Sequence, residues 1–430
     1  GTNDAPVAGV AITNSDAIEA GVAANGSSVE TVNASGGVNA LFAGVTDVDD
    51  NSFIVAQAKL SGVENSYSAV QAGSTSVSNG LAIAGSYGTL TVGADGSYVY
   101  VVTNDNEFIQ ALDESETITD TFTIQVSDGA GGTAEKTLEI EIQGTNDVPI
   151  SSGEITNVNA VEAGVAINGS AVATVNATGS ANALFANVSD VDDNAFVVAQ
   201  AKYYSGTYAS VTADTTSATG TAVTGSYGTL TVGADGSYVY VVTNDNEVIQ
   251  ALDESETITD TFTIQVSDGA GGRVEQTLAV TVDGTNDAPV AGVAITNSDA
   301  IEAGVAANGS SVETVNASGG VNALFAGVTD VDDNSFIVAQ AKLSGVENSY
   351  SAVQAGSTSV SNGLAIAGSY GTLTVGADGS YVYVVTNDNE FIQALDESET
   401  ITDTFTIQVS DGAGGTAEKT LEIEIQGTND

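Results

Sequence analysis

The residues best suited to chemistry in this sequence are acidic, and they recur in short motifs along the chain. Five motifs follow one another in the same order in each third of the sequence: EAG, TDVDDN or SDVDDN, LDESET, VSDG and GTND. Calcium takes about six to eight oxygen ligands, which carboxylates, amides and backbone carbonyls can supply without histidine or cysteine. The motifs therefore indicate that the chain binds a hard divalent cation, Ca²⁺.

The overall composition narrows the possible functions. Aspartate and glutamate number 56 against six lysines and arginines, so the net charge is −50, and histidine and cysteine are absent. This charge repels phosphate backbones and anionic lipids, so we expect no nucleic-acid partner and no direct membrane contact. Nucleophiles activated by histidine, and zinc sites built on imidazole or thiolate, are excluded. Only paired carboxylates could catalyse a reaction, and we expect no enzyme.

The sequence shows no targeting segment. It has no run of about 18 apolar residues, which a membrane-spanning helix needs, and no basic stretch followed by a short apolar one, as in a signal peptide. It begins inside one repeat and stops inside the linker to the next. We therefore expect a fragment of a longer protein.

Internal repetition gives the domain organisation. The tetrapeptide GTND begins at Gly1, Gly144, Gly284 and Gly427, with spacings of 143, 140 and 143 residues, and residues 1–147 reappear unchanged at 284–430. A period of this length is too long for a solenoid repeat and suits an independent domain. We predict three domains at residues 1–143, 144–283 and 284–430, of which 427–430 begin a further linker. We call them domains one, two and three.

Periodicity within a repeat predicts β-structure. Apolar residues alternate with polar ones over residues 121–126 and 137–142, which indicates half-buried antiparallel strands. Residues 89–102 hold two more strands around a turn at 94–96, where Asp-Gly suits a tight hairpin. Only residues 105–112 show helical spacing, with Asn104 or Asp105 as the N-cap. The predicted fold is all-β: tandem Greek-key β-sandwiches in three copies.

Two blocks carry a family resemblance. The segment from Leu112 to Asp147, LDESETITDTFTIQVSDGAGGTAEKTLEIEIQGTND, and the block GADGSYVYV resemble the VCBS and cadherin-like tandem repeats that form the extender regions of large bacterial RTX-type adhesins. The first block covers roughly the last third of every repeat. The resemblance implies calcium ions between consecutive domains, and the motif residues that match can be assigned to each junction.

The implied ligands fall into four groups. At the first junction they are Glu19, Asp113, Glu116, Asn146 and Asp147, facing Asp190, Asp192 and Asp268. At the second they are Glu162, Asp253, Glu256, Asn286 and Asp287, facing Asp330, Asp332 and Asp411. Matching positions at the two ends of the chain are Asn3, Asp4, Asp47, Asp49 and Asp128, and Glu302, Asp396 and Glu399.

The resemblance also implies a role. The chain would be a spacer on the bacterial cell surface, exported by type I secretion, that projects a distal ligand-binding domain for adhesion or biofilm formation. Its partners would be calcium and the neighbouring repeats. Carboxylates about 4–5 Å apart repel by about 1 kcal/mol per pair in water, so metal-free junctions should be loose and bound calcium should stiffen them. Pro6, Pro149 and Pro289 follow the linkers and restrict their backbones.

Two alternatives remain open at this point. Each repeat could itself bind a glycan or a like domain through the variable segment 60–84, where domain one has Tyr67 and domain two has Tyr203, Tyr204 and Tyr208 nearby. A glycosidase would instead need Asp113 and Asp128 on either side of a pocket the size of a sugar. Tyr98 and Tyr100 are expected to stack on sheet neighbours. Lys136 and Arg273 are expected to be ordinary surface charges.

Overall fold

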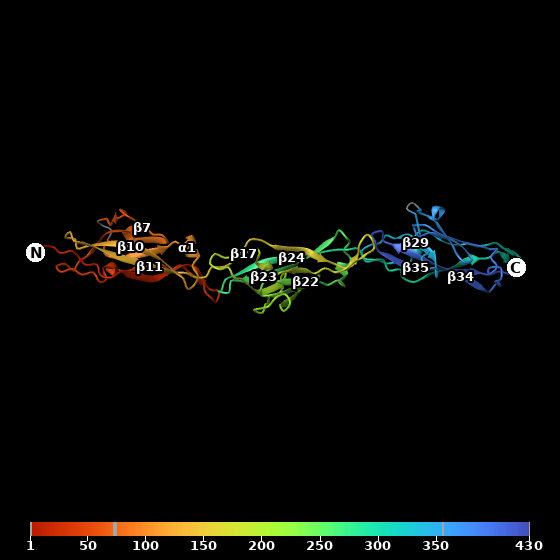
Figure 1. Cartoon of the computed structure of the whole chain (residues 1–430), viewed down its shortest axis with the longest axis horizontal. Coiled ribbons are helices and arrows are strands. Elements are labelled where there is room, and N and C mark those ends of the chain that lie inside the picture. Colours follow the sequence, from red (N-terminus) through yellow and green to blue (C-terminus); the bar gives the residue numbers. More distant parts are fainter. Residues whose placement is uncertain (1, 72–74, 355–356, 430) are drawn as a thin grey trace.

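The three domains follow one another in a line, with the chain termini at opposite ends (Figure 1). The computed structural model describes residues 2–71, 75–354 and 357–429. Residues 72–74 of the predicted variable segment 60–84 lie outside the described part. Among the described residues, no helix has the length and apolar character needed to cross a bilayer.

Domain one is built from β-strands, with three single-turn helical segments. Its elements are β1 (Ile12–Ile18), β2 (Gly21–Val22), β3 (Ser28–Val29), β4 (Ala34–Gly36), η1 (Ala40–Phe42), β5 (Ile54–Leu60), β6 (Ser68–Ala69), η2 (Val77–Asn79), β7 (Leu81–Ala84), β8 (Gly88–Val92), β9 (Tyr98–Val102), α1 (Glu107–Gln110), β10 (Thr117–Ser127) and β11 (Thr133–Gln143).

Domain two repeats the order of the strands, adds the short β12–β17 pair and has no counterpart of η2 among its described residues. Its elements are β12 (Ile150–Ser151), β13 (Ile155–Val161), β14 (Gly164–Val165), β15 (Ala171–Val172), β16 (Ala177–Gly179), η3 (Ala183–Phe185), β17 (Val188–Ser189), β18 (Val197–Tyr203), β19 (Ala209–Ser210), β20 (Thr221–Thr224), β21 (Gly228–Val232), β22 (Tyr238–Val242), α2 (Glu247–Gln250), β23 (Thr257–Ser267) and β24 (Arg273–Asp283).

Domain three has the same sequence as domain one and the same strands. Its elements are β25 (Ile295–Ile301), β26 (Gly304–Val305), β27 (Ser311–Val312), β28 (Ala317–Gly319), η4 (Ala323–Phe325), β29 (Ile337–Leu343), β30 (Ser351–Ala352), η5 (Val360–Asn362), β31 (Leu364–Ala367), β32 (Gly371–Val375), β33 (Tyr381–Val385), β34 (Thr400–Ser410) and β35 (Thr416–Gln426).

Each domain is a sandwich of a five-stranded and a four-stranded sheet. In domain one the orders are β1-β11-β10-β5-β6 and β4-β9-β8-β7. The pairs are antiparallel except β1 with β11, which run parallel, so the chain crosses the whole domain between its first and last long strands. The predicted all-β Greek-key sandwich in three copies is confirmed.

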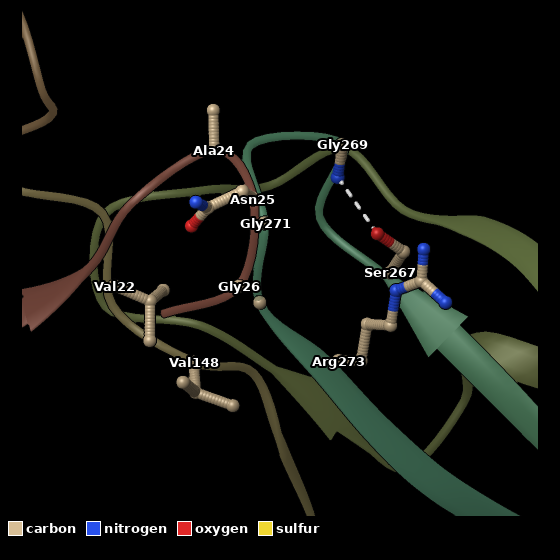
Figure 2. Close-up of a pocket in the computed structure, with 10 residues that line it drawn as sticks. Val22, Ala24, Asn25, Gly26, Val148, Ser267, Gly269, Gly271 and Arg273 are labelled. Atoms are coloured by element: carbon tan, nitrogen blue, oxygen red, sulfur yellow. Dashed lines mark hydrogen bonds between the residues drawn. The ribbon is translucent and has the colours of Figure 1, made fainter. Parts of the chain in front are cut away.

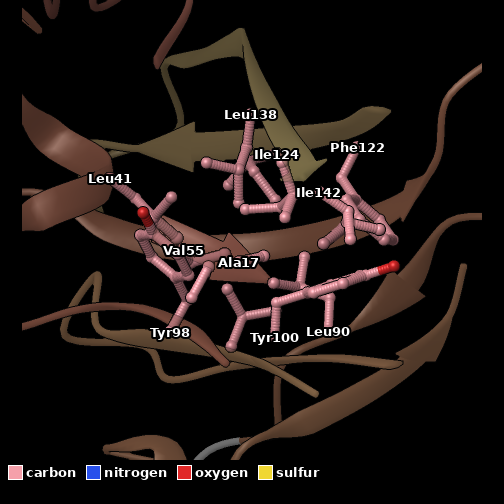
Figure 3. Packing of buried hydrophobic residues seen from close by; sticks show 14 of the residues in the cluster. Ala17, Leu41, Val55, Leu90, Tyr98, Tyr100, Phe122, Ile124, Leu138 and Ile142 are labelled. Atoms are coloured by element: carbon pink, nitrogen blue, oxygen red, sulfur yellow. The ribbon is translucent and has the colours of Figure 1, made fainter. Parts of the chain in front are cut away.

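The core fills the space between the two sheets (Figure 3). Leu138, Ile140 and Ile142 of β11 are fully buried, as their alternation with polar residues predicts. Tyr100 of β9 lies edge-on to Phe122 of β10, with ring centroids 6.0 Å apart. Tyr100 thus packs across the core on the opposite sheet, and not on a neighbour in its own sheet as expected.

A buried carboxylate joins the two sheets. Asp120 on β10 is 1% exposed, and its oxygens accept hydrogen bonds from the Tyr100 hydroxyl at 2.6 Å and from the backbone N–H groups of Ser86 and Tyr87 at 2.9 and 3.0 Å. These bonds connect β10 to β9 and to the turn before β8. Burial and the Asp120 carboxylate raise the pKa of Tyr100. The hydroxyl therefore stays protonated and donates.

Two local predictions are wrong in detail. The helix expected within 105–112, of one or two turns, is the single turn α1, but its N-cap is Asn106 and not Asn104 or Asp105: Asn106 Oδ1 accepts from Phe108 N at 2.9 Å. Lys136, expected at the surface, is 2% exposed. Its Nζ donates to three backbone carbonyls at 2.7–2.9 Å, those of Ala8, Val10 and Ala43.

Candidate metal centre at the domain junctions

The first junction is built around the fully buried carboxylate of Glu19, which directly follows β1. Glu19 Oε1 accepts from Gln110 Nε2 at 3.1 Å, and Oε2 accepts from the linker N–H of Thr145 at 3.3 Å. Burial raises the pKa of Glu19 to about 8, and the negative charges of Asp147 and Asp192 add to the rise. A buried carboxylate with these two hydrogen-bond donors to offset its charge can be stabilised by a cation.

The linker connects this carboxylate to domain two. Asn146 is fully buried, and its backbone carbonyl accepts from Val22 N at 2.7 Å. Its Nδ2 donates to Asp268 Oδ2 of domain two at 3.0 Å. The next backbone N–H, of Asp147, donates to Asp192 Oδ2 at 2.8 Å. The structure thus brings residues of the GTND, SDVDDN and VSDG motifs of two domains to one place.

The second junction repeats these contacts. Asn286 Nδ2 donates to Asp411 Oδ2 at 3.0 Å. Asp287 N donates to Asp332 Oδ2 at 2.7 Å. Burial raises the pKa of Glu162, the counterpart of Glu19, to about 7. The arrangement is therefore a property of the repeat and not of one linker.

Buried oxygens without a partner mark both junctions. A buried polar atom without a hydrogen bond is rare in folded proteins and often indicates an ion or water at that position. At the first junction these atoms are Thr145 Oγ1, Asn146 Oδ1, Asp147 Oδ2, Asp190 Oδ2 and Asp192 Oδ1. At the second they are Glu162 Oε2, Thr285 Oγ1, Asn286 Oδ1, Asp287 Oδ2, Asp330 Oδ2 and Asp332 Oδ1.

The donor set fits calcium. It consists of carboxylate, amide and hydroxyl oxygens, which are the hard ligands that calcium prefers. Burial raises the pKa of Asp147 to about 6 and that of Asp190 to about 7, in each case with Asp192 adding to the rise. These shifts express the cost of holding several charges together without a cation. Across the described ranges, no three acidic side chains are arranged as a group that could hold a metal ion.

The LDESET acids lie at the edge of the junction. Asp113 and Glu116 are exposed, and Glu116 Oε2 accepts weakly from Asp113 N at 3.5 Å. Asp113 nevertheless comes close enough to domain two for its charge to help raise the pKa of Asp193, which burial raises first. In domain two, Asp253 and Glu256 are likewise exposed and contact each other. These residues are thus less tightly placed than Glu19, Asn146 and Asp147.

The N-terminal end of domain one shows the contacts of a junction. Asn3 Nδ2 donates to Asp128 Oδ2 at 2.8 Å, which lowers the pKa of Asp128, and Asp4 N donates to Asp49 Oδ2 at 3.4 Å. Asp47 Oδ2 is buried without a partner. The GTND segment therefore engages the domain that follows it in the same way at all three positions.

The C-terminal end of domain three shows the other half of a junction. Thr428 N donates to Glu302 Oε1 at 2.6 Å, as Thr145 does to Glu19. Asp396 and Glu399 are exposed and contact each other through the Asp396 N–H at 3.1 Å.

Sequence reasoning missed several groups at the junction. Thr145 contributes a buried hydroxyl, Gln110 holds Glu19, and Asn104 Oδ1 accepts from Ala20 N at 2.6 Å. The threonine could have been found, because the T of GTND recurs with the N and D. Gln110 and Asn104 are separated from the acidic motifs in sequence, so no local pattern indicates them.

The two domains also touch directly beside the acidic cluster (Figure 2). The turn between β2 and β3 meets the β23–β24 turn so closely that a Cβ atom on Gly271 would lie 2.3 Å from Ala23 O. Gly271 also has a φ of 129°, which disfavours other residues. Gly414 meets Ala166 in the same way at the second junction. A cavity of about 560 Å³, lined in part by Arg273, lies between the turns.

The fold places the two carboxylates named for the glycosidase alternative beyond opposite ends of one strand. Asp113 precedes the start of β10 and Asp128 follows its end. A strand rises about 3.3 Å per residue, so the eleven residues of β10 separate the two carboxylates by more than about 30 Å. Paired carboxylates in glycosidases lie within about 10 Å of each other. These two cannot act on one bond.

Comparisons with known proteins agree with this architecture. The sequence profile of the bacterial cadherin-like domain matches three times, at residues 3–144, 146–284 and 286–427. No curated protein sequence matches the chain.

Solved structures similar to the chain include cadherin fragments. Mouse cadherin-23 EC22-24 aligns over 100% of both chains, with 13% identity and a TM-score of 0.43. Domains 1–3 of protocadherin gamma C5 align over 96% of this chain and 99% of theirs, with 10% identity and a TM-score of 0.41. Domains 3–6 of protocadherin gamma B2 align over 98% and 72%, with 11% identity and a TM-score of 0.38. By its three profile matches, the chain belongs to the family of bacterial cadherin-like domains.

Proposed function

We propose that this chain is a calcium-stiffened extender, a structural part of a bacterial surface adhesin that holds a distal binding domain away from the cell. Cadherin-like repeats support an extracellular, adhesion-type structural role and not catalysis. The one observation that carries the proposal is the recurrence, at both junctions, of buried oxygens without partners contributed by two domains and their linker.

The proposed ligands at the first junction come from both domains. Glu19 and the linker residues Asn146 and Asp147 would hold calcium together with Asp190 and Asp192. Asp268 accepts from Asn146 on one oxygen, and Asp113 and Glu116 would join as outer ligands. The second junction would use the corresponding residues from Glu162 to Asp411.

Bound calcium would supply the positive charge that balances these carboxylates. The protein's own part is to fix the linker. Val22 N binds the Asn146 carbonyl on one side, and Asp192 and Asp268 bind the linker on the other, so the linker backbone is attached to both domains. A cation shared by these side chains would oppose bending at this point.

Isothermal titration calorimetry of the chelator-treated chain tests this proposal. We expect saturable calcium binding at both junctions and much weaker binding of Mg²⁺, which dehydrates reluctantly and demands a stricter octahedral geometry. Replacing Asp192 and Asp332 together with asparagine should remove most of the binding. Absence of calcium binding at millimolar concentration would refute the proposal.

The adhesin context is a further part of the proposal. The resemblance to VCBS and RTX-type repeats supports placement on the bacterial surface after type I secretion, where millimolar calcium would be available. Domains one and three are identical in sequence, which suits a spacer, since a spacer needs length and not a distinct surface in each copy.

A further inference from the structure

Domain two differs from its identical neighbours at the end of β18 and in the segment after it. It has Tyr203 and Tyr204 where domain one has Leu60 and Ser61. The backbone contacts show this correspondence, because Tyr204 N donates to Thr261 O and Ser61 N donates to Thr121 O, the matching threonine of domain one. Two surface hollows of about 340 and 300 Å³ share both tyrosines as lining residues.

Tyr204 is held in an unfavourable conformation with its ring in solvent. Its φ is 41°, in the left-handed region that is a genuine outlier for a bulky residue, and its side chain is 73% exposed. Its backbone N–H donates to Thr261 O at 3.2 Å, which fixes the main chain. Core packing does not account for the strain, because the ring is not in the core. Strain of this kind is concentrated at ligand-binding positions.

Tyr203 forms a fixed wall beside it. Its ring packs on Phe262 with centroids 5.4 Å apart, and its hydroxyl shares a hydrogen bond with Ser226 Oγ at 2.7 Å. The two hollows therefore have one rigid aromatic side and one exposed aromatic side. Neither side depends on the junction carboxylates.

The lining of the hollows is neutral and rich in hydroxyl groups. Nine residues line them together, of which seven carry a hydroxyl and none carries a charge, although the chain has a net charge of −50. Thr259 and Thr261 lie on the outward face of β23, and Thr224 on β20 takes the place of Ala84 in domain one. Domain two has therefore gained both aromatic and hydroxyl groups at this position.

We propose that domain two carries a binding site for a neutral carbohydrate, with a sugar ring stacked on Tyr204 and its hydroxyls bonded to the threonines of the hollow that it occupies, either Thr259 and Thr261 or Thr224. Aromatic faces and hydroxyl donors match the apolar C–H face and the hydroxyl edge of a pyranose. An acidic sugar would need a cation to balance it, and none lines the hollows. This site goes beyond the extender function and is independent of the calcium junctions.

Saturation-transfer difference NMR on the 430-residue chain tests the site, because it detects weak ligands. The probes are neutral mono- and oligosaccharides of glucose, galactose, mannose, fucose and N-acetylglucosamine at millimolar concentration, with sialic acid and a neutral peptide for comparison. We expect transfer to at least one neutral sugar, unchanged by EDTA. Tyr204→Ser, which restores the residue of domain one, should weaken binding about tenfold, the size expected for loss of one aromatic contact.

The control variant exchanges a residue of one domain for the residue at the matching position of another. Phe108→Val replaces another exposed aromatic residue by the one that domain two has, Val248, and should leave sugar binding unchanged. If Tyr204→Ser lowers the melting temperature, Tyr204→Gly, which tolerates a positive φ, takes its place. Transfer to no neutral sugar, equal transfer in the Tyr204 variants, preference for sialic acid or the peptide, or loss of binding in EDTA would each overturn the site.

Discussion

Asn146 Nδ2 donates to Asp268 Oδ2 at 3.0 Å across a domain boundary, although the two residues are 122 positions apart in the sequence. The bond turns the amide so that its oxygen, Oδ1, is buried without a partner. The same orientation recurs between Asn286 and Asp411. The side-chain N–H of this linker asparagine binds the next domain, and its oxygen has no hydrogen-bond partner. The oxygen is therefore suited to hold a cation between the two domains.

Removing the charge of Asp268 should weaken the first junction alone. In Asp268→Asn, the amide of Asn146 loses a carboxylate partner and the cluster loses one negative charge, so we expect calcium affinity at that junction to fall about tenfold or more, that is about 1.4 kcal/mol. Calorimetry should show one weakened and one unchanged class of site. Asp214→Asn, at an exposed loop position with positive φ, is the matched control. Equal affinity in both variants would contradict the assignment.

Without calcium, acid should stabilise the protein. The pKa of Glu19 is raised from 4.5 to about 8 and that of Asp190 from 3.8 to about 7, so between these limits the folded chain binds more protons than the unfolded chain. Stability therefore falls as pH rises through this window. In EDTA, we expect a higher melting temperature at pH 5.5 than at pH 8.5.

Calcium should reverse this order, because protons and calcium compete for the same oxygens. Binding to the folded state alone stabilises it, and more so at pH 8.5, where fewer protons compete; at millimolar calcium we therefore expect the melting temperature to be higher at pH 8.5 than at pH 5.5. A melting temperature in EDTA that rises with pH would show that the junction carboxylates are not under strain.

The sequence predicts the sandwich and many of the junction residues, because short sequence patterns indicate both. Alternation in 121–126 and 137–142 identifies strands β10 and β11, and the GTND repeat identifies Asn146 and Asp147. Gln110 could not be predicted, since it reaches Glu19 only after 91 residues of chain have folded.

The burial of Lys136 could not be predicted from the sequence either. Its position in a polar and apolar alternation places it on β11, but its burial depends on the segment before β1 covering it. That segment has no regular pattern. The parallel pairing of β1 with β11 likewise depends on how the whole chain returns across the domain.

Asp120 should be a main stabiliser of domain one. Asp120→Asn replaces an acceptor of three hydrogen bonds by a group that cannot accept them all, so Tyr100 or a backbone N–H stays buried without a partner. We expect a loss of about 1–3 kcal/mol in the free energy of unfolding of this domain. Urea unfolding measures it, with exposed Asp105→Asn as the control; equal stability of the two variants would contradict the role of Asp120.

Lys136 should attach the N-terminal segment to domain one. Lys136→Met leaves the carbonyls of Ala8, Val10 and Ala43 without their donor, and we expect a loss of about 3 kcal/mol in urea unfolding. Domain two has Gln276 at this position, and its Oε1 accepts from Ser151 Oγ.

The difference between Lys136 of domain one and Gln276 of domain two allows a rescue experiment. Because Ser151 corresponds to Ala8, the double variant Lys136→Gln with Ala8→Ser should recover part of the stability that Lys136→Gln alone loses. If the double variant is no more stable than the single one, the lysine does not act through these contacts.

Small-angle X-ray scattering of the whole chain in calcium and in EDTA tests the central claim most directly. If shared calcium ions stiffen the junctions, calcium should increase the maximum dimension and narrow the distance distribution, and the Asp192→Asn, Asp332→Asn double variant should resemble the wild-type chain in EDTA even when calcium is present. Identical scattering curves with and without calcium would contradict the account.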